Sequence, residues 1–350
     1  RLKGTPITAG KMKEIDNPNG DIKVFAGGKT VIKAFEEDIP RANIIRVPAV
    51  LVQSRGVIDA VYYEEPFTFK NEMWAYTADE KTSVKYLYYV LKNNIQQFRV
   101  AASGMGSMPQ ISLKVTEEFI IPVPPLPVQS EIVRILDNFT ELTAELTAEL
   151  TARKKQYEYY RKELLTFTDD VKKVPLIDVV KIKRGVRVVK SQLAVEGEYP
   201  VFQNSMTPLG YMDKANCTGD TAFIITAGAA GEIGYTDNDF WAADDCFSFE
   251  CPQYLKSKYL YYILLCQKNT IYSKVRKASI PRLPRSAIEK LIIPVPNVDI
   301  QEKIVDVLDR FDTLCNDISK GLPAEIEARQ KQYEYYRDKL LTFKESSDEN

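Results

Sequence analysis

The stretch RKKQYEYYRKELLTF occupies residues 153–167, and RQKQYEYYRDKLLTF occupies residues 329–343. Twelve of the fifteen positions are identical, and the two copies start 176 residues apart. A long polar segment rich in tyrosine rarely occurs twice in one chain by chance. The recurrence therefore indicates an internal duplication, and its extent decides the fold.

The duplication continues upstream of both copies. Residues 120–139 (IIPVPPLPVQSEIVRILDNF) match 292–311 (IIPVPNVDIQEKIVDVLDRF), and KYLYYVL at 85–91 matches KYLYYIL at 258–264. Each repeat is therefore a globular segment followed by a helical one.

The two globular segments do not begin alike. The second opens with VPLIDVVKIKRG, residues 174–185, whose alternating apolar pattern predicts a strand that enters a turn at Arg184 and Gly185. The first begins at Arg1, near the position that would match residues 181–184. We therefore expect a short N-terminal segment to be missing from the first repeat.

Apolar residues repeat with heptad spacing in both helical segments, which predicts long helices that pack against a partner helix. Prolines precede each helix, and Gly321 and Pro323 predict a break or kink in the second one. The first helix contains the tandem tetrapeptide TAELTAEL at residues 143–150, which indicates a length adjustable by about one turn. The predicted seam residues are Val128, Ile132, Ile135, Phe139, Leu142 and Leu146, and then Ile300, Ile304, Val307, Phe311, Leu314 and Ile318.

Composition limits the class of protein. The 350 residues are 45% hydrophobic and 27% charged, with no apolar run of the ~20 residues that span a bilayer. Five scattered cysteines without a C-x-x-C pair favour a reducing cytoplasm. Histidine is absent, which excludes Ser-His-Asp and Cys-His nucleophiles, H-E-x-x-H metal sites and zinc deaminase chemistry. Chemistry based on carboxylates and a metal ion stays open.

Two basic clusters stand out, at residues 181–190 (KIKRGVRVVK) and 274–285 (KVRKASIPRLPR). Loops near Gly and Pro can present several cations to one phosphate backbone, although ordinary solvated loops are an equally good interpretation of either cluster alone. The glycine-rich residues 225–234 lead into a strand pattern and not a helix, which favours a β-turn over a nucleotide site. Asp244 and Asp245 are half of a carboxylate metal site at most.

Two further features favour structure over chemistry. NPNG at residues 17–20 lacks the aromatic residue of an adenine methyltransferase loop and predicts a turn. The tyrosines of the two KYLYY segments lie on short helical patterns and are expected to be core and interface residues. No segment therefore carries a credible catalytic constellation.

The IIPVP segments, the glutamines Gln129 and Gln301 that follow them, the QYEYYR–LLTF helices and the TAEL repeats together resemble the specificity subunit of a type I restriction–modification enzyme. The resemblance covers nearly the whole chain. It implies an α+β fold with two tandem mixed α/β target recognition domains, separated by two long antiparallel coiled-coil helices in a pseudo-twofold internal repeat. The implied domains are residues 1–127 and 169–297, and the implied spacer helices are 128–168 and 298–350.

The same resemblance implies a function without catalysis in this chain. Each domain would read one half of a split double-stranded DNA target, while two adenine methyltransferase subunits dock on the chain and two ATP-dependent restriction subunits can add to that core. S-adenosylmethionine, ATP and Mg²⁺ would then belong to the partners, and this chain would hold no cofactor. A stand-alone duplicated DNA-binding regulator and a metal-dependent nuclease are the rival interpretations.

Two groups of residues are expected to make these contacts. Those expected to face DNA are Lys11, Lys13, Arg55, Arg99, Ser103 and Gln110 in the first domain, and Lys183, Arg184, Arg187, Lys190, Arg276, Lys277, Arg282 and Arg285 in the second. Those expected to face the partner subunits are Gln156, Tyr157, Tyr160 and Arg161, with Gln332, Tyr333, Tyr336 and Arg337. Packing within the coiled coil is the alternative role of the second group. The bases read and the length of the gap between half-sites do not follow from the sequence.

Overall fold

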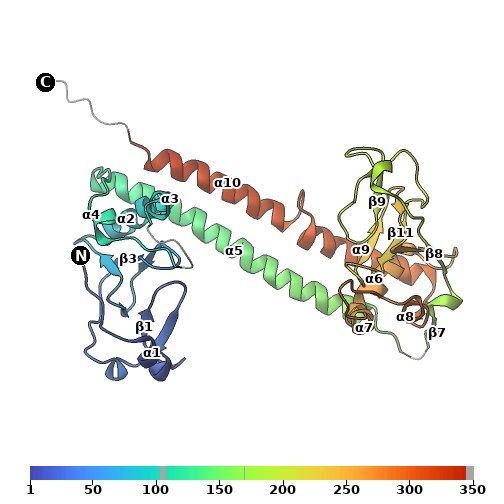
Figure 1. Cartoon of the computed structure of the whole chain (residues 1–350), viewed down its shortest axis with the longest axis horizontal. Coiled ribbons are helices and arrows are strands. Elements are labelled where there is room, and N and C mark those ends of the chain that lie inside the picture. The colour runs from blue at the N-terminus through green and yellow to red at the C-terminus, as the bar shows by residue number, and fades with distance from the viewer. Residues whose placement is uncertain (103–107, 169, 344–350) are drawn as a thin grey trace. The chain divides into compact units, whose positions relative to one another are not determined.

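The computed structural model describes residues 1–102, 108–168 and 170–343. The chain divides into two compact units: unit 1 comprises residues 1–145 and 326–350, and unit 2 comprises residues 146–325. Each unit combines one globular domain with parts of two helical segments (Figure 1). None of the helices in the described part of the chain is both long and apolar enough to cross a membrane.

The domain of unit 1 contains two small sheets. The first has the strand order β2-β1-β5, with β1 and β5 parallel, and the second is the antiparallel sheet β4-β3-β6, on which α2 packs. The elements are α1 (Ala9–Ile15), β1 (Ile22–Phe25), β2 (Val31–Ala34), η1 (Glu36–Asp38), β3 (Ala49–Gln53), β4 (Asp59–Tyr63), β5 (Phe67–Phe69), β6 (Trp74–Tyr76), α2 (Lys81–Asn93), α3 (Ile95–Val100) and α4 (Leu113–Glu117).

The domain of unit 2 repeats this architecture. Sheet β10-β9-β13 corresponds to β2-β1-β5, and sheet β12-β11-β14-β8 corresponds to β4-β3-β6 with one more strand; β15 pairs with β7. The elements are β7 (Lys173–Pro175), η2 (Leu176–Asp178), β8 (Lys181–Arg184), η3 (Lys190–Gln192), β9 (Tyr199–Phe202), β10 (Tyr211–Met212), β11 (Thr221–Ile225), β12 (Ile233–Thr236), β13 (Trp241–Ala242), β14 (Cys246–Glu250), α6 (Ser257–Cys266), α7 (Lys268–Ser273), α8 (Arg285–Glu289) and β15 (Ile292–Pro294).

The start of the second repeat differs from the single strand that its sequence predicts. Residues 174–185 do not form one strand, because Leu176 is fully buried and its N–H donates to Leu291 O, which places a 3₁₀ turn between β7 and β8. In unit 1 Leu2 forms an isolated antiparallel bridge with Ala75, in the way that Lys183 of β8 pairs with Ser248.

Helix α5 (Leu126–Leu164) runs for 39 residues and passes from unit 1 into unit 2. The second helical segment consists of α9 (Val298–Asn316) and α10 (Leu322–Leu341), so the break expected at Gly321 is confirmed. A Cβ atom on Gly321 would lie 2.4 Å from Thr313 O, and only glycine therefore fits at this junction. Pro323 lies in the first turn of α10, where a missing N–H is tolerated.

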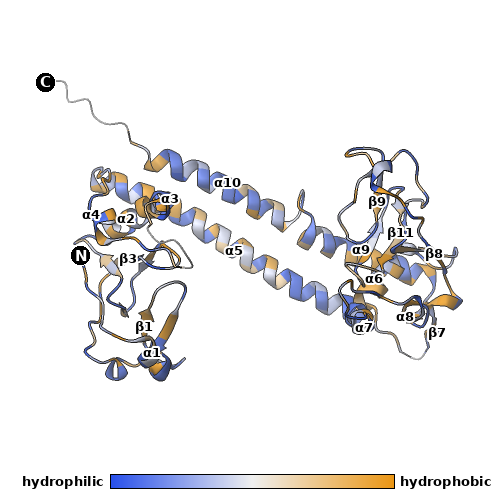
Figure 2. Ribbon diagram, in the orientation of Figure 1, coloured by the Kyte–Doolittle hydropathy of each residue, from blue (hydrophilic) through white to orange (hydrophobic). Residues whose placement is uncertain are grey.

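The helices pack side by side within each unit. In unit 1 Phe139 of α5 stacks on Tyr336 of α10 with ring centroids 5.6 Å apart, and Val128 lines the same surface hollow as Phe343. Residue numbers thus rise along one helix as they fall along the other, which makes the pair antiparallel. Figure 2 shows apolar residues recurring between polar ones along both helices.

The most buried residue of α5 in this region is Leu136, which lies outside the predicted heptad seam. It packs in one cluster with Ile132, with Tyr86 and Tyr89 of α2, and with Leu341 of α10. The seam is therefore only part of the buried surface of α5, because a second face of the helix packs against α2 of the globular domain.

The KYLYY segment is the joint between each domain and its helix. In unit 1 Tyr89 Oη donates to Asp137 Oδ1 at 2.5 Å, Lys85 pairs with the same carboxylate at 2.7 Å, and Tyr86 Oη donates to Pro122 O at 3.0 Å. These tyrosines are buried, as the sequence predicts. The equivalent contacts of unit 2 are Tyr262 to Asp309 at 2.5 Å, Lys258 to Asp309 at 3.0 Å and Tyr259 to Pro294 O at 3.1 Å.

Candidate nucleic-acid interface

The domain of unit 2 carries a concave pocket of about 350 Å³ where its two basic clusters meet. Three arginines gather here from separate parts of the chain. Arg184 comes from the end of β8, and Arg276 and Arg282 come from the loop that follows α7. The remaining lining residues are Thr226, Asp244, Asp245, Phe247, Ala278, Ile280, Leu283 and Pro284.

Backbone pairing holds the arginine loop in place. Arg276 and Arg282 exchange N–H···O bonds of 2.8 and 3.2 Å, and Gly228 N donates to Pro281 O at 3.1 Å. Gly228 has φ +78°, and a Cβ atom there would lie 2.7 Å from Asn204 O. The glycine-rich residues 225–234 therefore form a tight connection between the antiparallel strands β11 and β12, as expected.

A backbone oxygen and a carboxylate lie beside two of the arginines. Arg184 Nε donates to the backbone O of Asp244 at 3.0 Å. Arg282 Nη1 lies 3.9 Å from Asp245 Oδ1, and the two side chains are 64% and 23% exposed. A guanidinium held at one side can still present nitrogens to a second acceptor, because it carries five donors in a fixed fork. The pocket therefore suits a ligand rich in hydrogen-bond acceptors.

Other predicted residues of unit 2 lie outside this pocket. Lys183 donates to Glu250, and this hydrogen bond lowers the pKa of the Glu250 carboxyl. Arg285 pairs with Glu289 at 2.8 Å. Arg187, Lys190 and Lys277 are exposed, the first two beyond β8 and the third next to Arg276 on the same loop.

The domain of unit 1 has a pocket of about 540 Å³ that contains Lys13 and Arg55 among the predicted residues. Lys70, Asp16 and Glu72 also line it. The backbones of Arg55 and Gln110 form a bridge, and Ala227 and Arg282 form the equivalent bridge 172 residues later. This match shows that the loop around Gln110 is equivalent to the loop around Arg282.

The other predicted residues of unit 1 are less closely grouped. Lys11 pairs with Glu14 at 2.8 Å, and Arg99 Nε donates to Ile58 O at 3.1 Å. Ser103 lies outside the described residues.

Sequence reasoning missed Glu72 and Lys70, and it considered Asp245 only as half of a metal site. Within residues 1–102, 108–168 and 170–343, no group of three or more His, Cys, Asp or Glu side chains could hold a metal ion. The available signal was the repeat offset, because Glu72 and Asp245 lie 173 residues apart, as the two KYLYY segments do.

The residues expected to face a partner lie in the two copies of the repeated helical stretch, at residues 153–167 and 329–343. Tyr157 is buried in the core of unit 2 and stacks on Phe311 at 6.1 Å. Tyr160 also stacks on Phe311, at 5.5 Å, and is 39% exposed. Gln156 accepts a hydrogen bond from Arg153, and Arg161 lies over the ring of Tyr157. In the second copy Gln332 accepts from Arg329, Arg337 lies over Tyr333, and Tyr336 stacks on Phe139 and is 43% exposed.

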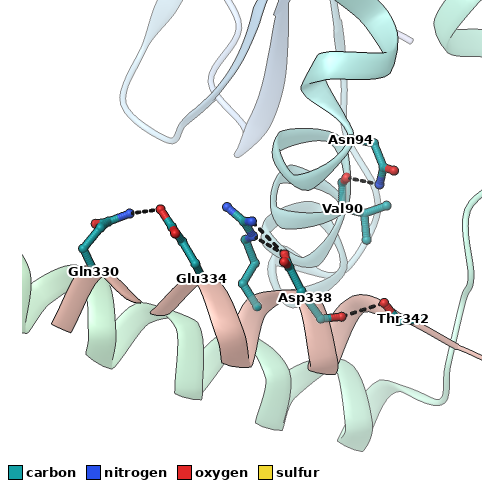
Figure 3. A network of polar contacts seen from close by, with 7 residues as sticks. Val90, Asn94, Gln330, Glu334, Asp338 and Thr342 are labelled. Atoms are coloured by element: carbon teal, nitrogen blue, oxygen red, sulfur yellow. Dashed lines mark hydrogen bonds and ion pairs between the residues drawn. The ribbon is translucent and has the colours of Figure 1, made fainter. Parts of the chain in front are cut away.

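Sequence reasoning also missed the most exposed tyrosine of each copy. Tyr159 and Tyr335 are both 60% exposed and occupy the same position of the repeat. Lys339 Nζ lies 5.7 Å from the ring centroid of Tyr335. Elsewhere on α10, Gln330 Nε2 donates to Glu334 at 3.0 Å and Thr342 Oγ1 donates to Asp338 O at 2.6 Å (Figure 3). Gln330, Glu334 and Asp338 are exposed and recur every four residues, so one face of α10 carries a row of polar side chains.

Two copies of one α/β domain, each with a concave pocket lined by both cations and carboxylates, define an internally duplicated protein. The profile of the type I restriction modification DNA specificity domain matches residues 6–153 and 168–328. The chain belongs to this family. Its relatives are specificity subunits, which are non-catalytic, and the chain is thus a specificity subunit and not one of the catalytic subunits.

Named relatives cover most of the chain. The specificity subunit of the type I restriction enzyme EcoR124I/EcoR124II from Escherichia coli is 35% identical over 294 residues, or 76% of this chain and 72% of that protein. The MpnII specificity subunit of Mycoplasma pneumoniae is 29% identical over 69% of this chain and 94% of its own length. The crystal structure of the type I restriction–modification S subunit from M. genitalium shares the fold, with a TM-score of 0.71, 17% identity, and coverage of 98% of this chain and 93% of that one.

Proposed function

We propose that this specificity subunit reads a bipartite double-stranded DNA target, one half-site with each domain. The observation that carries the proposal is that each of the two DNA specificity domains has a pocket lined by cations, while the side chains at equivalent positions differ. Arg282 in the second domain corresponds to Gln110 in the first, as their matching backbone bridges indicate. Equivalent loops with different side chains would read different bases, because donor and acceptor patterns distinguish base pairs in the major groove.

The helices supply the second part of the proposal. α5 with the α9–α10 segment would form an antiparallel coiled coil that spaces the domains. Each QYEYYR copy would dock one methyltransferase subunit, with Tyr159 and Tyr335 as the exposed aromatic anchors. Restriction subunits would add to that core. S-adenosylmethionine, ATP and Mg²⁺ would then be bound by the partners, and the complex would act in the cytoplasm.

The direct test is to assemble the full chain with its methyltransferase subunits and sequence the methylated adenines across a genome. A split recognition sequence with an unread gap is the expected result. The chain alone should neither methylate nor cleave DNA when supplied with Mg²⁺, ATP and S-adenosylmethionine. Tight sequence-specific binding by the chain alone would favour the regulator instead, and cleavage by it alone would favour the nuclease.

A charge variant tests the pocket itself. Alanine at Arg184, Arg276 and Arg282 together should weaken DNA binding by the assembled complex and flatten its salt dependence, because fewer counterions are released. The matched control replaces three exposed cations outside the pocket, namely Lys172, Lys290 and Lys303. Equal losses in both variants would show that the pocket does not face DNA.

A further inference from the structure

A carboxylate occupies the same place in both pockets, Asp245 in unit 2 and Glu72 in unit 1. Thr226 Oγ1 donates to the backbone O of Asp245 at 2.9 Å, and Ser54 Oγ donates in the same way to the backbone O of Glu72. Thr226 and Ser54 are themselves equivalent, since the backbone O of Thr226 accepts from Leu283 N and that of Ser54 accepts from Ile111 N. The main chain that carries each carboxylate is therefore fixed in both domains.

The cation beside this carboxylate differs between the domains. Asp245 lies 3.9 Å from Arg282, whereas Glu72 lies 2.9 Å from Lys70. Glu72 and Lys70 are 29% and 22% exposed, so both stay accessible from the pocket. The two domains therefore share an acidic side chain at this position but differ in the cation that pairs with it.

Phosphate contact does not account for a carboxylate in this position. On a surface that only neutralises the DNA backbone, cations increase the affinity for DNA. A carboxylate placed among them decreases this affinity, because it repels the negatively charged phosphates. Base edges, however, present donors as well as acceptors. In the major groove Asp and Glu accept from the N4 amino group of cytosine, and Arg or Lys donates to O6 and N7 of guanine. An acid beside a cation therefore matches both members of one G·C pair.

We propose that Asp245 and Glu72 are base-reading residues, each accepting a hydrogen bond from the amino group of a cytosine in the half-site of its own domain. Arg282 and Lys70 donate to the guanine paired with that cytosine. This inference rests on the proposed function, and it adds the base pair that each pocket selects.

The test is Asp245→Asn in the full chain, assembled with its methyltransferase subunits, followed by sequencing of the methylated sites. Asparagine keeps the shape and one acceptor but adds an N–H₂ donor, which can reach O4 of thymine. One cytosine of the second half-site should become cytosine or thymine, with the preference for cytosine falling about 5- to 100-fold. The first half-site should not change.

Two further variants serve as controls. Glu72→Gln should produce the reciprocal result, a relaxed first half-site and an unchanged second one. Glu250→Gln removes a carboxylate of the same domain that pairs with Lys183 outside the pocket, and it should alter neither half-site.

A binding measurement gives an answer that does not depend on methylation. The cytosine is replaced in a duplex by an analogue without the 4-amino group, and affinity is measured for the wild-type and Asp245→Asn complexes. A loss of about fivefold or more in the wild type that is absent in the variant supports the proposal. An equal loss in both refutes it.

The outcomes separate the two proposals. If both variants methylate with unchanged half-sites, the base-reading role is wrong while the bipartite function stands. If the wild-type complex methylates a site that is not split, or if one substitution alters both half-sites, the proposed function itself is wrong.

Discussion

The two glutamines that follow the IIPVP segments should respond oppositely to the same substitution. Gln301 is fully buried, its Oε1 accepts from Lys256 N at 2.8 Å, and its Nε2 donates to Tyr254 O at 2.9 Å and to Pro296 O at 2.8 Å. Gln129 is also buried, and its Nε2 donates to Pro124 O at 2.8 Å. Within the described residues, Oε1 of Gln129 has no hydrogen-bond partner.

Methionine removes the amide of either residue and nearly keeps its shape. In Gln301→Met three hydrogen bonds are lost at about 1 kcal/mol each, and the N–H of Lys256 is left without its acceptor, so we expect a cost of about 3–4 kcal/mol. In Gln129→Met one hydrogen bond of about 1 kcal/mol is lost, but a buried unpaired oxygen that costs about 1–3 kcal/mol disappears. The second variant should therefore be neutral or up to about 2 kcal/mol more stable.

Native-state hydrogen exchange is the appropriate assay, since a chain with two units need not unfold in one step. Amides of α6 and α9 should exchange about 100-fold faster or more in Gln301→Met, because 1.4 kcal/mol corresponds to tenfold. Amides of α2 should keep or gain protection in Gln129→Met. A loss at α2 as large as that at α6 would refute the reasoning, because it would mean that Oε1 of Gln129 carries a hydrogen bond in solution.

Three further predictions concern the helices. Tyr262→Phe removes the hydroxyl that binds Asp309, a hydrogen bond to a charged group, and should destabilise the joint of unit 2 by about 1.5–3 kcal/mol in the same exchange assay, whereas Phe at exposed Tyr159 should have no effect. Gly321→Ala should shift the junction of α9 and α10 and lower the melting temperature, because its Cβ would collide with a backbone oxygen; an unchanged melting curve would contradict the close approach. Deleting residues 147–150 removes about 6 Å of helix and should shorten the unread gap by one or two base pairs while both half-sites keep their bases. Sequencing methylated sites tests this last prediction, and an unchanged gap in an active complex would discard it.

Local patterns were enough to predict the duplication, the helices and the break at Gly321. These features depend on the spacing of apolar residues and on the backbone limits of Gly and Pro, which act over a few residues and stay visible in the sequence. The β-turn at residues 225–234 was predictable for the same reason, since the pattern after it is that of a strand.

Tertiary packing decided which of the predicted basic residues line the pocket of unit 2. Arg184 and Arg282 are far apart in the sequence, and only the pairing of β8 with β14 and of Ala227 with Arg282 brings them into one pocket. Lys183, next to Arg184, was equally plausible from its charge, but alternate residues of a strand point to opposite faces and it meets Glu250 instead.

Tertiary packing likewise decides which tyrosines of the repeated helix are buried and which are exposed. Periodicity shows that QYEYYR has distinct faces, but it does not say which face meets a neighbour. Phe311 covers Tyr157 in unit 2, and Tyr159, two positions later, is left exposed. The phase of a helix against its surroundings is fixed by residues far away in the chain, and burial is therefore decided only when the chain has folded.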